Sequence, residues 1–169
     1  MLSILLSTGG SVMEINEMTV QECTAFLENA SLGRLGCSYE NQPYVVPIHF
    51  AYQDRYLYGF STFGQKVKWM RTNPKVCLQT DEIQNPDDWV SVIVDGEYEE
   101  LADPQRTSEL KRARSLLAIP YDWWLNAFGE RQMRVSESPM DPLFFRIRIQ
   151  SMSGLRATEG KGGEEVLTP

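Results

Sequence analysis

The sequence predicts one mainly β domain: a small, mostly antiparallel barrel of about six strands with peripheral helices. Short stretches of strand-like residues are separated by polar turn residues, as in antiparallel sheets. Helical patterns lie between these stretches or at their ends, and closing the sheet into a barrel removes exposed edges. At 169 residues the chain is long enough for one domain with its own core and short for two.

The charge and the cysteines exclude several kinds of partner. The formal net charge of −7 would repel nucleic acid and anionic membranes, so any bound phosphate must be held by local groups. Cys23, Cys37 and Cys77 show no CxxC spacing and are odd in number, so neither a disulfide framework nor a zinc site is predicted. We expect buried, reduced thiols.

The ends of the chain are expected to lie outside the domain. The first residues are apolar but lack a basic start, and Gly9 and Gly10 interrupt them, so they do not resemble a signal peptide and a cytoplasmic location is expected. We predict a flexible N-terminal extension over residues 1–13, the folded domain over residues 14–157, and a disordered tail rich in Gly and Glu over residues 158–169.

The domain is predicted to begin with a helix and a strand. Thr19 and Glu22 have the spacing of a capping box. Apolar residues then follow with helical spacing to Ala30. Weak alternation over residues 32–37 indicates a first strand, and residues 40–42 supply a polar turn.

The next two strands form a predicted hairpin. Residues 43–52 are apolar on both alternating faces, so this strand is expected to be buried on both sides. Pro47 cannot donate a ladder hydrogen bond, which places a bulge, an edge or a ligand contact there. Residues 53–55 turn the chain into a strand over residues 56–60.

A loop and a helix are predicted to follow the hairpin. Residues 61–64 read as the loop and residues 65–71 as the helix, which ends before Pro74. Residues 76–80 indicate a strand and the polar residues 81–88 a loop. The strand pattern resumes over residues 89–101, where Gly96 is expected at a bulge or a close backbone approach.

The last third of the chain is predicted to hold helices and a final strand. Asp103 and Pro104 are typical of a helix start, and Leu110, Ala113 and the two leucines at 116–117 form its buried stripe. Residues 122–128 are predicted to form a short aromatic helix and residues 129–142 a polar connector. Alternation over residues 143–150 indicates a strand with one wetter face.

A phosphate site is the strongest chemical prediction. Ser61 and Thr62 carry hydroxyls just before a helix start, whose free N–H groups also donate. Lys66 and Lys68 supply countercharge in an acidic protein. The alternative is an ordinary N-cap on a solvated basic helix. No P-loop motif is present.

His49 is the only histidine, so no metal site built from histidines is predicted. Its imidazole is able to donate to a flavin or a substrate, to ligate haem, or to serve only as a structural barrel residue. Trp123 and Trp124 are candidates for a stacking wall, a subunit interface or simply the core.

The segment PYVVPIHFAYQDRYLYGFSTFGQKVKWMRTNPKVCLQ, residues 43–79, resembles the core of the pyridoxamine 5′-phosphate oxidase-like FMN-binding split barrels, and within them the nitroimidazole-resistance-type subgroup. The resemblance continues from the strand at Leu32 through that near Gly96 to that at Phe144. It implies a six-stranded antiparallel split barrel of the FMN-binding type that forms a homodimer, with FMN in clefts at the interface.

The resemblance also implies a set of cofactor-binding residues. Those expected to line the isoalloxazine, largely through backbone groups, are Val46, Pro47, Ile48 and His49. Those expected to hold the FMN phosphate are Ser61, Thr62 and Lys66. His49 is also the candidate catalytic residue.

The implied function is an FMN-dependent oxidoreductase that acts on a small molecule. The alternatives are a non-catalytic flavin-binding or haem-binding module, with His49 as the haem ligand, and a deazaflavin-dependent reductase. Phe60 stands where many members of the subgroup carry a histidine, so chemistry that depends on that histidine does not carry over. No residue set for the pyridoxal phosphate site of the true oxidase is evident, so vitamin salvage is not predicted.

Overall fold

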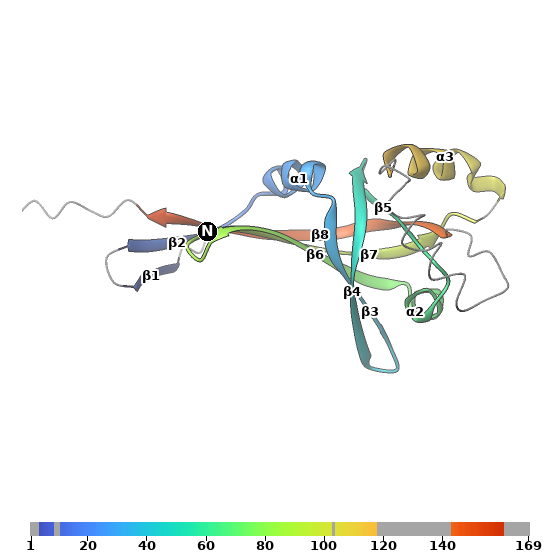
Figure 1. Ribbon diagram of the computed structural model, residues 1–169, viewed down its shortest axis with the longest axis horizontal. Helices are drawn as coiled ribbons and strands as arrows, with labels where there is room; N and C mark the ends of the chain where they lie inside the picture. The colour runs from blue at the N-terminus through green and yellow to red at the C-terminus, as the bar shows by residue number, and fades with distance from the viewer. Residues whose placement is uncertain (1–3, 9–10, 103, 118–142, 161–169) are drawn as a thin grey trace, which may run out of the picture.

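The computed structural model describes residues 4–8, 11–102, 104–117 and 143–160, which form one antiparallel sheet with helices packed around it (Figure 1). The strands are β1 (Ile4–Thr8), β2 (Ser11–Glu17), β3 (Leu32–Tyr39), β4 (Gln42–Gln53), β5 (Tyr56–Ser61), β6 (Lys75–Asn85), β7 (Asp88–Glu100) and β8 (Leu143–Gly160). The helices are α1 (Val20–Asn29), α2 (Gln65–Thr72) and α3 (Thr107–Leu116), which follows a 3-10 turn at Pro104–Arg106.

The sheet closes on itself. Its strand order is β1-β2-β8-β5-β4-β3-β6-β7, and β7 also pairs with β8. The strands β3 to β8 therefore form a ring of six, and all the pairs in it are antiparallel. This confirms the predicted mainly β, six-stranded antiparallel barrel.

Helix α1 begins at the predicted capping box. The N–H of Glu22 donates to Thr19 Oγ1 at 3.3 Å, and the N–H of Thr19 donates to Glu22 Oε2 at 2.8 Å. These bonds satisfy two donors that a helix start leaves free. Cys23 and Leu27 on the inner side of α1 are buried.

Tight turns hold β4 between its neighbours. Glu40 and Asn41 join β3 to β4, while Asp54 and Arg55 join β4 to β5, and all four residues have positive φ. Two-residue turns of this kind match the twist of an antiparallel hairpin. Over Gln42–His49, the only strand among the described residues that pairs with β4 is β3. Pro47 therefore lies on a sheet edge, which was one of the three predicted explanations.

The arm formed by β6 and β7 corrects one prediction. Residues 81–88 were expected to form a loop, but β6 continues to Asn85 and β7 begins at Asp88. Residues 82–86 are exposed. Strand pairing rather than burial therefore stabilises this part of the arm, so the apolar alternation that marks a half-buried strand is absent.

The last strand is also longer than predicted. It was expected over residues 143–150, but β8 runs to Gly160. Gly96 lies at the expected bulge, because Asp95 pairs with Ser151 whereas Gly96 pairs with Ile149. A Cβ atom at Gly96 would lie 2.6 Å from the carbonyl oxygen of Arg148, so the close approach requires glycine.

Strands cross the limits that the sequence suggested for the domain, and the division into domain and tails stays a prediction. Residues 4–8 form β1, which pairs with β2, and β2 pairs with the end of β8. The limits expected at residues 13 and 157 therefore fall inside β2 and β8. The helix expected at residues 122–128 and the connector at residues 129–142 lie outside the described residues.

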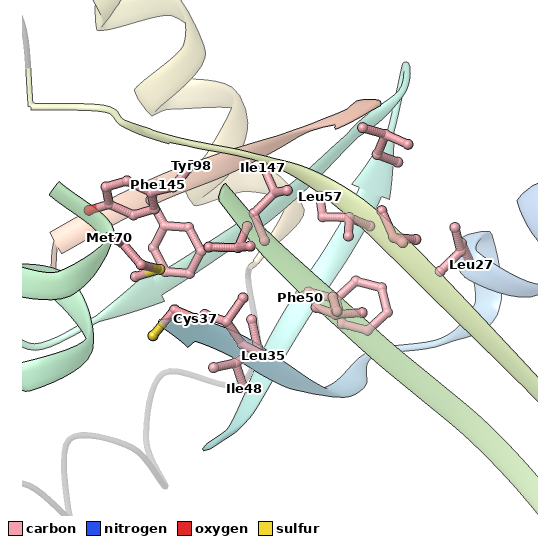
Figure 2. Packing of buried hydrophobic residues seen from close by; sticks show 14 of the residues in the cluster. Leu27, Leu35, Cys37, Ile48, Phe50, Leu57, Met70, Tyr98, Phe145 and Ile147 are labelled. Carbon is pink, nitrogen blue, oxygen red and sulfur yellow. The ribbon is translucent and has the colours of Figure 1, made fainter. Parts of the chain in front are cut away.

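The main core fills the barrel, and helices cover its two ends. Figure 2 shows Met70 of α2 beside Phe145 and Tyr98 at one end of the core and Leu27 of α1 at the other. A second, smaller cluster under α3 contains Tyr58, Leu101, Ala113 and Leu117.

An ion-pair group joins β7 to β8 beside α3. Glu99 Oε2 accepts hydrogen bonds from Arg146 at 2.8 Å and from Arg106 at 2.9 Å. The guanidinium of Arg146 lies 4.1 Å from the ring centroid of Tyr56. Burial alone would raise the pKa of Glu99, but the hydrogen bonds and charges of the two arginines outweigh it, so the pKa lies below its ordinary value.

This shift predicts acid-sensitive stability. Because the pKa of Glu99 is lowered on folding, its contribution is complete above the ordinary value of 4.5 and is lost as the pH falls through the folded-state pKa. We expect Glu99→Gln to lower the free energy of unfolding by about 1.5–3 kcal/mol at pH 7. Urea titrations at pH 7 and pH 3 measure this loss, which should shrink at pH 3.

Glu97→Gln is the matched control, because Glu97 pairs with Arg148 at a more exposed position on the same strand. We expect this change to cost less than about 1 kcal/mol. An equal loss for Glu99→Gln at both pH values would contradict the electrostatic explanation and leave packing as the cause.

Candidate functional site

The predicted cofactor residues lie on the two sides of a split in the barrel. Strands β4 and β5 pair from Gln53 to Phe50, which is opposite Gly59. Beyond that pair β4 continues with β3 alone, while β5 leads into the loop before α2 (Figure 1). The split therefore separates the β4 residues of the prediction from those that surround the start of α2.

The β4 side offers backbone groups more than side chains. Ile48 is buried in the barrel and Val46 packs against the same core. Pro47 and His49 alternate with them and lie on the outer face. Because this part of β4 has one neighbouring strand in the described ranges, its other row of backbone groups has no ladder pairing within them. The predicted isoalloxazine contacts are compatible with this arrangement and stay a prediction.

His49 lines a pocket of about 310 Å³ on the outer face. The pocket lies between β4 and the C-terminal ends of α1 and α3. Helix C-termini carry partial negative charge, and Glu28 adds a carboxylate, so the pocket favours ligands that donate hydrogen bonds. Its lining residues are Glu28, Asn29, Ala30, Ser31, His49, Phe50, Ala51, Tyr52, Leu116 and Leu117.

The other side of the split contains an uncapped helix start. Gly64 is the N-cap of α2 and supplies no side-chain hydrogen bond. The first intrahelical N–H donor is that of Lys68, which bonds the Gly64 carbonyl at 3.1 Å. Ser61 is buried and its hydroxyl donates to the Thr62 carbonyl at 2.8 Å, so it does not cap the helix. The N–H groups of residues 65–67 therefore point out of the helix start without a capping side chain.

Lys66, in the first turn of α2, is half-buried. Burial lowers the pKa of its ammonium group, and the nearby Cys37 thiol acts weakly in the opposite direction. In the part of the chain that the structure describes, Lys66 forms no ion pair, whereas Arg71 of the same helix binds Glu100 through two hydrogen bonds of 2.8 and 2.7 Å. A partly desolvated cation beside free N–H groups suits an anionic ligand.

These features favour the phosphate site over the ordinary N-cap that the sequence left open. Gly64 is an acceptable N-cap residue but has no side-chain acceptor, so the first N–H groups of α2 are left for water or a ligand. A solvated basic helix would expose its lysines, and Lys66 is half-buried. A phosphate monoester fits the charge and the donors present. That Ser61, Thr62 and Lys66 bind it stays a prediction.

The structure does not bring every predicted residue into one cavity. The pocket beside His49 does not contain Lys66, and a second pocket, between β3, β4, β6 and β7, contains neither residue. Phe60 lies outside the barrel, with its ring centroid 6.2 Å from that of Phe144. Trp123 and Trp124 lie outside the described residues.

Some neighbours of the site were not foreseen. Glu28 and Leu116 line the His49 pocket, and Cys37 lies near Lys66. Each belongs to an element far away in the chain, so no local sequence signal identifies it. Within the described ranges, no three His, Cys, Asp or Glu residues are grouped to hold a metal ion, and no helix is long and apolar enough to cross a membrane.

Known proteins include one family, one relative and several solved structures that are similar to this chain. The family profile described as pyridoxamine 5′-phosphate oxidase matches residues 19–156. An uncharacterized protein of Rhizobium meliloti is 36% identical over 150 residues, which cover 88% of this chain and 99% of that protein. A crystal structure of a FAD-binding protein from Mesorhizobium loti is 40% identical, with a TM-score of 0.72, and the match covers 87% of this chain and 99% of that one.

A more distant similarity concerns the fold alone. A crystal structure from Bacteroides thetaiotaomicron, of a protein proposed to confer 5-nitroimidazole antibiotic resistance, is 18% identical with a TM-score of 0.61. The match covers 94% of this chain and 96% of that one. It shows that the split barrel seen here is shared with that protein.

Proposed function

This chain belongs to the pyridoxamine 5′-phosphate oxidase family, and we propose that it is a flavin-dependent oxidoreductase that binds FMN and acts on a small molecule. The observation that carries the proposal is Lys66, a half-buried cation near Cys37 at the uncapped start of α2, the helix that follows β5. A flavin phosphate supplies the anion that this position suits.

The residues on the two sides of the split would bind different parts of the flavin. Lys66, the N–H groups of residues 65–67 and the Thr62 hydroxyl would bind the phosphate. The open edge of β4 at Val46–His49 would contact the isoalloxazine through backbone donors and acceptors. The bound flavin supplies the redox chemistry, so the protein needs to bind it, orient it and control access to it.

His49 is the proposed proton donor to the flavin or the substrate. It lies on the outer face of β4 at the end of the predicted isoalloxazine segment, and it lines the 310 Å³ pocket. A small substrate in that pocket would lie beside the imidazole. The pocket's negative helix ends would favour a substrate with hydrogen-bond donors.

The M. loti relative favours a second cofactor candidate. It is a FAD-binding protein at 40% identity, and FAD contains the complete FMN group. The phosphate site proposed here would hold the flavin-side phosphate of either molecule. The identity of the bound flavin is therefore a question separate from the presence of a flavin site.

The direct test is to identify the ligand of the purified protein. We expect the purified protein to be yellow and to show the absorbance bands of a bound flavin. Removing the ligand should abolish these bands, and incubation with FMN or FAD should restore them. Mass spectrometry of the released ligand should identify a flavin. Protein that stays colourless after both incubations would overturn the proposal. A native deazaflavin would indicate a deazaflavin-dependent reductase instead. A Soret band that is lost in His49→Ala would indicate a haem-binding module with His49 as the haem ligand.

We also propose that two copies of the chain complete the cofactor cleft. The part of β4 that pairs with β3 alone carries an exposed apolar side chain, Val45, which is 63% exposed. Such an edge is typically covered by another chain or element. Light scattering on the eluting protein measures the mass, and a monomer at micromolar concentration with bound flavin would contradict the dimer.

A further inference from the structure

The loop before α2 presents an aromatic side chain to the surface. Phe63 follows Thr62 directly, and its side chain is 56% exposed. Lys68 Nζ lies 5.6 Å and Arg71 Cζ 5.2 Å from its ring centroid. These two cations are three residues apart on α2, so they lie on one side of the helix and pack against the ring together.

The two cations differ in their remaining capacity to bind an anion. Arg71 is occupied by its two hydrogen bonds to Glu100. Among the described residues Lys68 forms no ion pair and is exposed. The exposed ring of Phe63 therefore has an available ammonium group beside it.

Lys66 and Lys68 lie on opposite sides of the helix start, because residues two apart in a helix are separated by just over half a turn. Lys66 is on the half-buried side near Cys37 and Lys68 on the side of Phe63. A ligand that passes from Lys66 across the free N–H groups reaches Lys68 and then the ring. Phe63 directly follows Thr62, a predicted phosphate ligand, so their Cα atoms are about 3.8 Å apart.

We propose that Phe63 and Lys68 form a site for an adenosine phosphate group, and that this group is the AMP half of FAD. The inference rests on the proposed flavin site. Lys66 and the helix start hold the flavin-side phosphate, Lys68 holds the adenosine-side phosphate, and the adenine stacks on the exposed part of Phe63. An aromatic ring stacks on a nucleobase and a neighbouring cation binds phosphate, which is the combination that single-stranded nucleic acid binding proteins use.

A purely structural role for Phe63 makes a different prediction. If the contacts with Lys68 and Arg71 only stabilise the loop, Phe63→Ala would change the unfolding midpoint or weaken both flavins equally. A nucleotide platform instead predicts that FAD alone loses affinity. A nicotinamide dinucleotide that donates electrons carries the same adenosine phosphate chemistry and is the other possible source.

Calorimetric titration of flavin-free protein with FMN and with FAD tests the proposal. We expect the wild type to bind FAD more tightly than FMN. Phe63→Ala should weaken FAD binding by roughly 5- to 150-fold, leave FMN binding unchanged and remove the preference for FAD. Phe63→Tyr, which keeps the ring, should retain most of the preference.

Lys68→Glu tests the phosphate contact, with Lys111→Glu on α3 as the control of equal charge change. We expect the first to weaken FAD more than FMN and the second to affect neither. Equal affinities of the wild type for FMN and FAD would overturn the inference and leave the flavin site intact. Binding of neither flavin would overturn both proposals together.

A further experiment distinguishes FAD from a nicotinamide dinucleotide as the source of the adenosine phosphate group. In FMN-loaded protein, steady-state titration with NADH and NADPH measures the KM for the electron donor. If Phe63→Ala raises that KM tenfold while FAD shows no advantage over FMN, the adenosine site belongs to the donor and its assignment to FAD is overturned. An unchanged KM together with a lost FAD preference supports FAD.

Discussion

Replacing Phe145 with Ala is expected to lower the free energy of unfolding by about 3–5 kcal/mol. The Phe145 ring is fully buried in the barrel, 5.4 Å from the ring centroid of Tyr98. Its edge fills the space that Gly59 leaves on β5, where a Cβ atom would lie 2.6 Å from Cζ of the ring. Deleting the ring leaves a cavity between β5 and β8, and the hydrogen-bonded strands cannot shift to fill it. Chemical denaturation of both proteins measures the loss.

A double-mutant cycle with Gly59→Ala tests the fit between the two residues. Alone, Gly59→Ala should cost about 1–3 kcal/mol, because the added methyl group collides with the ring. In the Phe145→Ala background the collision is absent, so the same change should cost nothing or restore stability. Phe144→Ala is the control, since Phe144 is half-buried on the other face of β8 and should cost less. Additive losses would contradict the proposed fit.

Lys66→Ala is expected to weaken flavin binding by roughly 10- to 100-fold, the loss that follows removal of a charge-assisted hydrogen bond. Lys66→Arg should recover part of the affinity because it keeps the charge. Titration of flavin-free protein followed by flavin fluorescence measures both changes. Unchanged affinity in Lys66→Ala would reject Lys66 as the phosphate ligand.

Stability separates this role from a structural one. Burial lowers the pKa of Lys66, so its charged form destabilises the flavin-free fold below the folded-state pKa, and this cost fades as the pH rises through that pKa. We therefore expect Lys66→Met to leave the flavin-free protein at least as stable as the wild type at pH 7 while binding flavin poorly. A lower thermal midpoint in Lys66→Met without flavin would show that the lysine stabilises the fold itself.

Local patterns in the sequence predicted the elements whose signals are complete within a few residues. The capping box of Thr19 and Glu22 begins α1, and the turn residues around Asp54 separate β4 from β5. Gly96 predicted the bulge because a strand glycine marks a close approach of backbones. In each case the cause lies within the segment itself.

Elements that depend on distant partners were not predictable in this way. The exposed part of the β6–β7 arm has no apolar alternation. Strand β1 pairs with β2, and β2 pairs with the end of β8, so both are strands because of their partners. The residue types around Lys66 predicted a phosphate site, and phosphate binding there stays a prediction. Its half-burial beside Cys37 was not, because β3 and α2 come together only in the folded barrel.

Among the strands that the structure describes, β8 is the last in chain order, and it pairs with β2, β5 and β7. During synthesis on the ribosome, β2, β5 and β7 are therefore made before β8. Each of these three strands has an unpaired edge until β8 is available to pair with it. Pairings over such long sequence separations are slow to form and leave edges exposed to other chains. Barrel closure is consequently a late event in synthesis, and the split between β4 and β5 cannot be rigid until β8 has emerged.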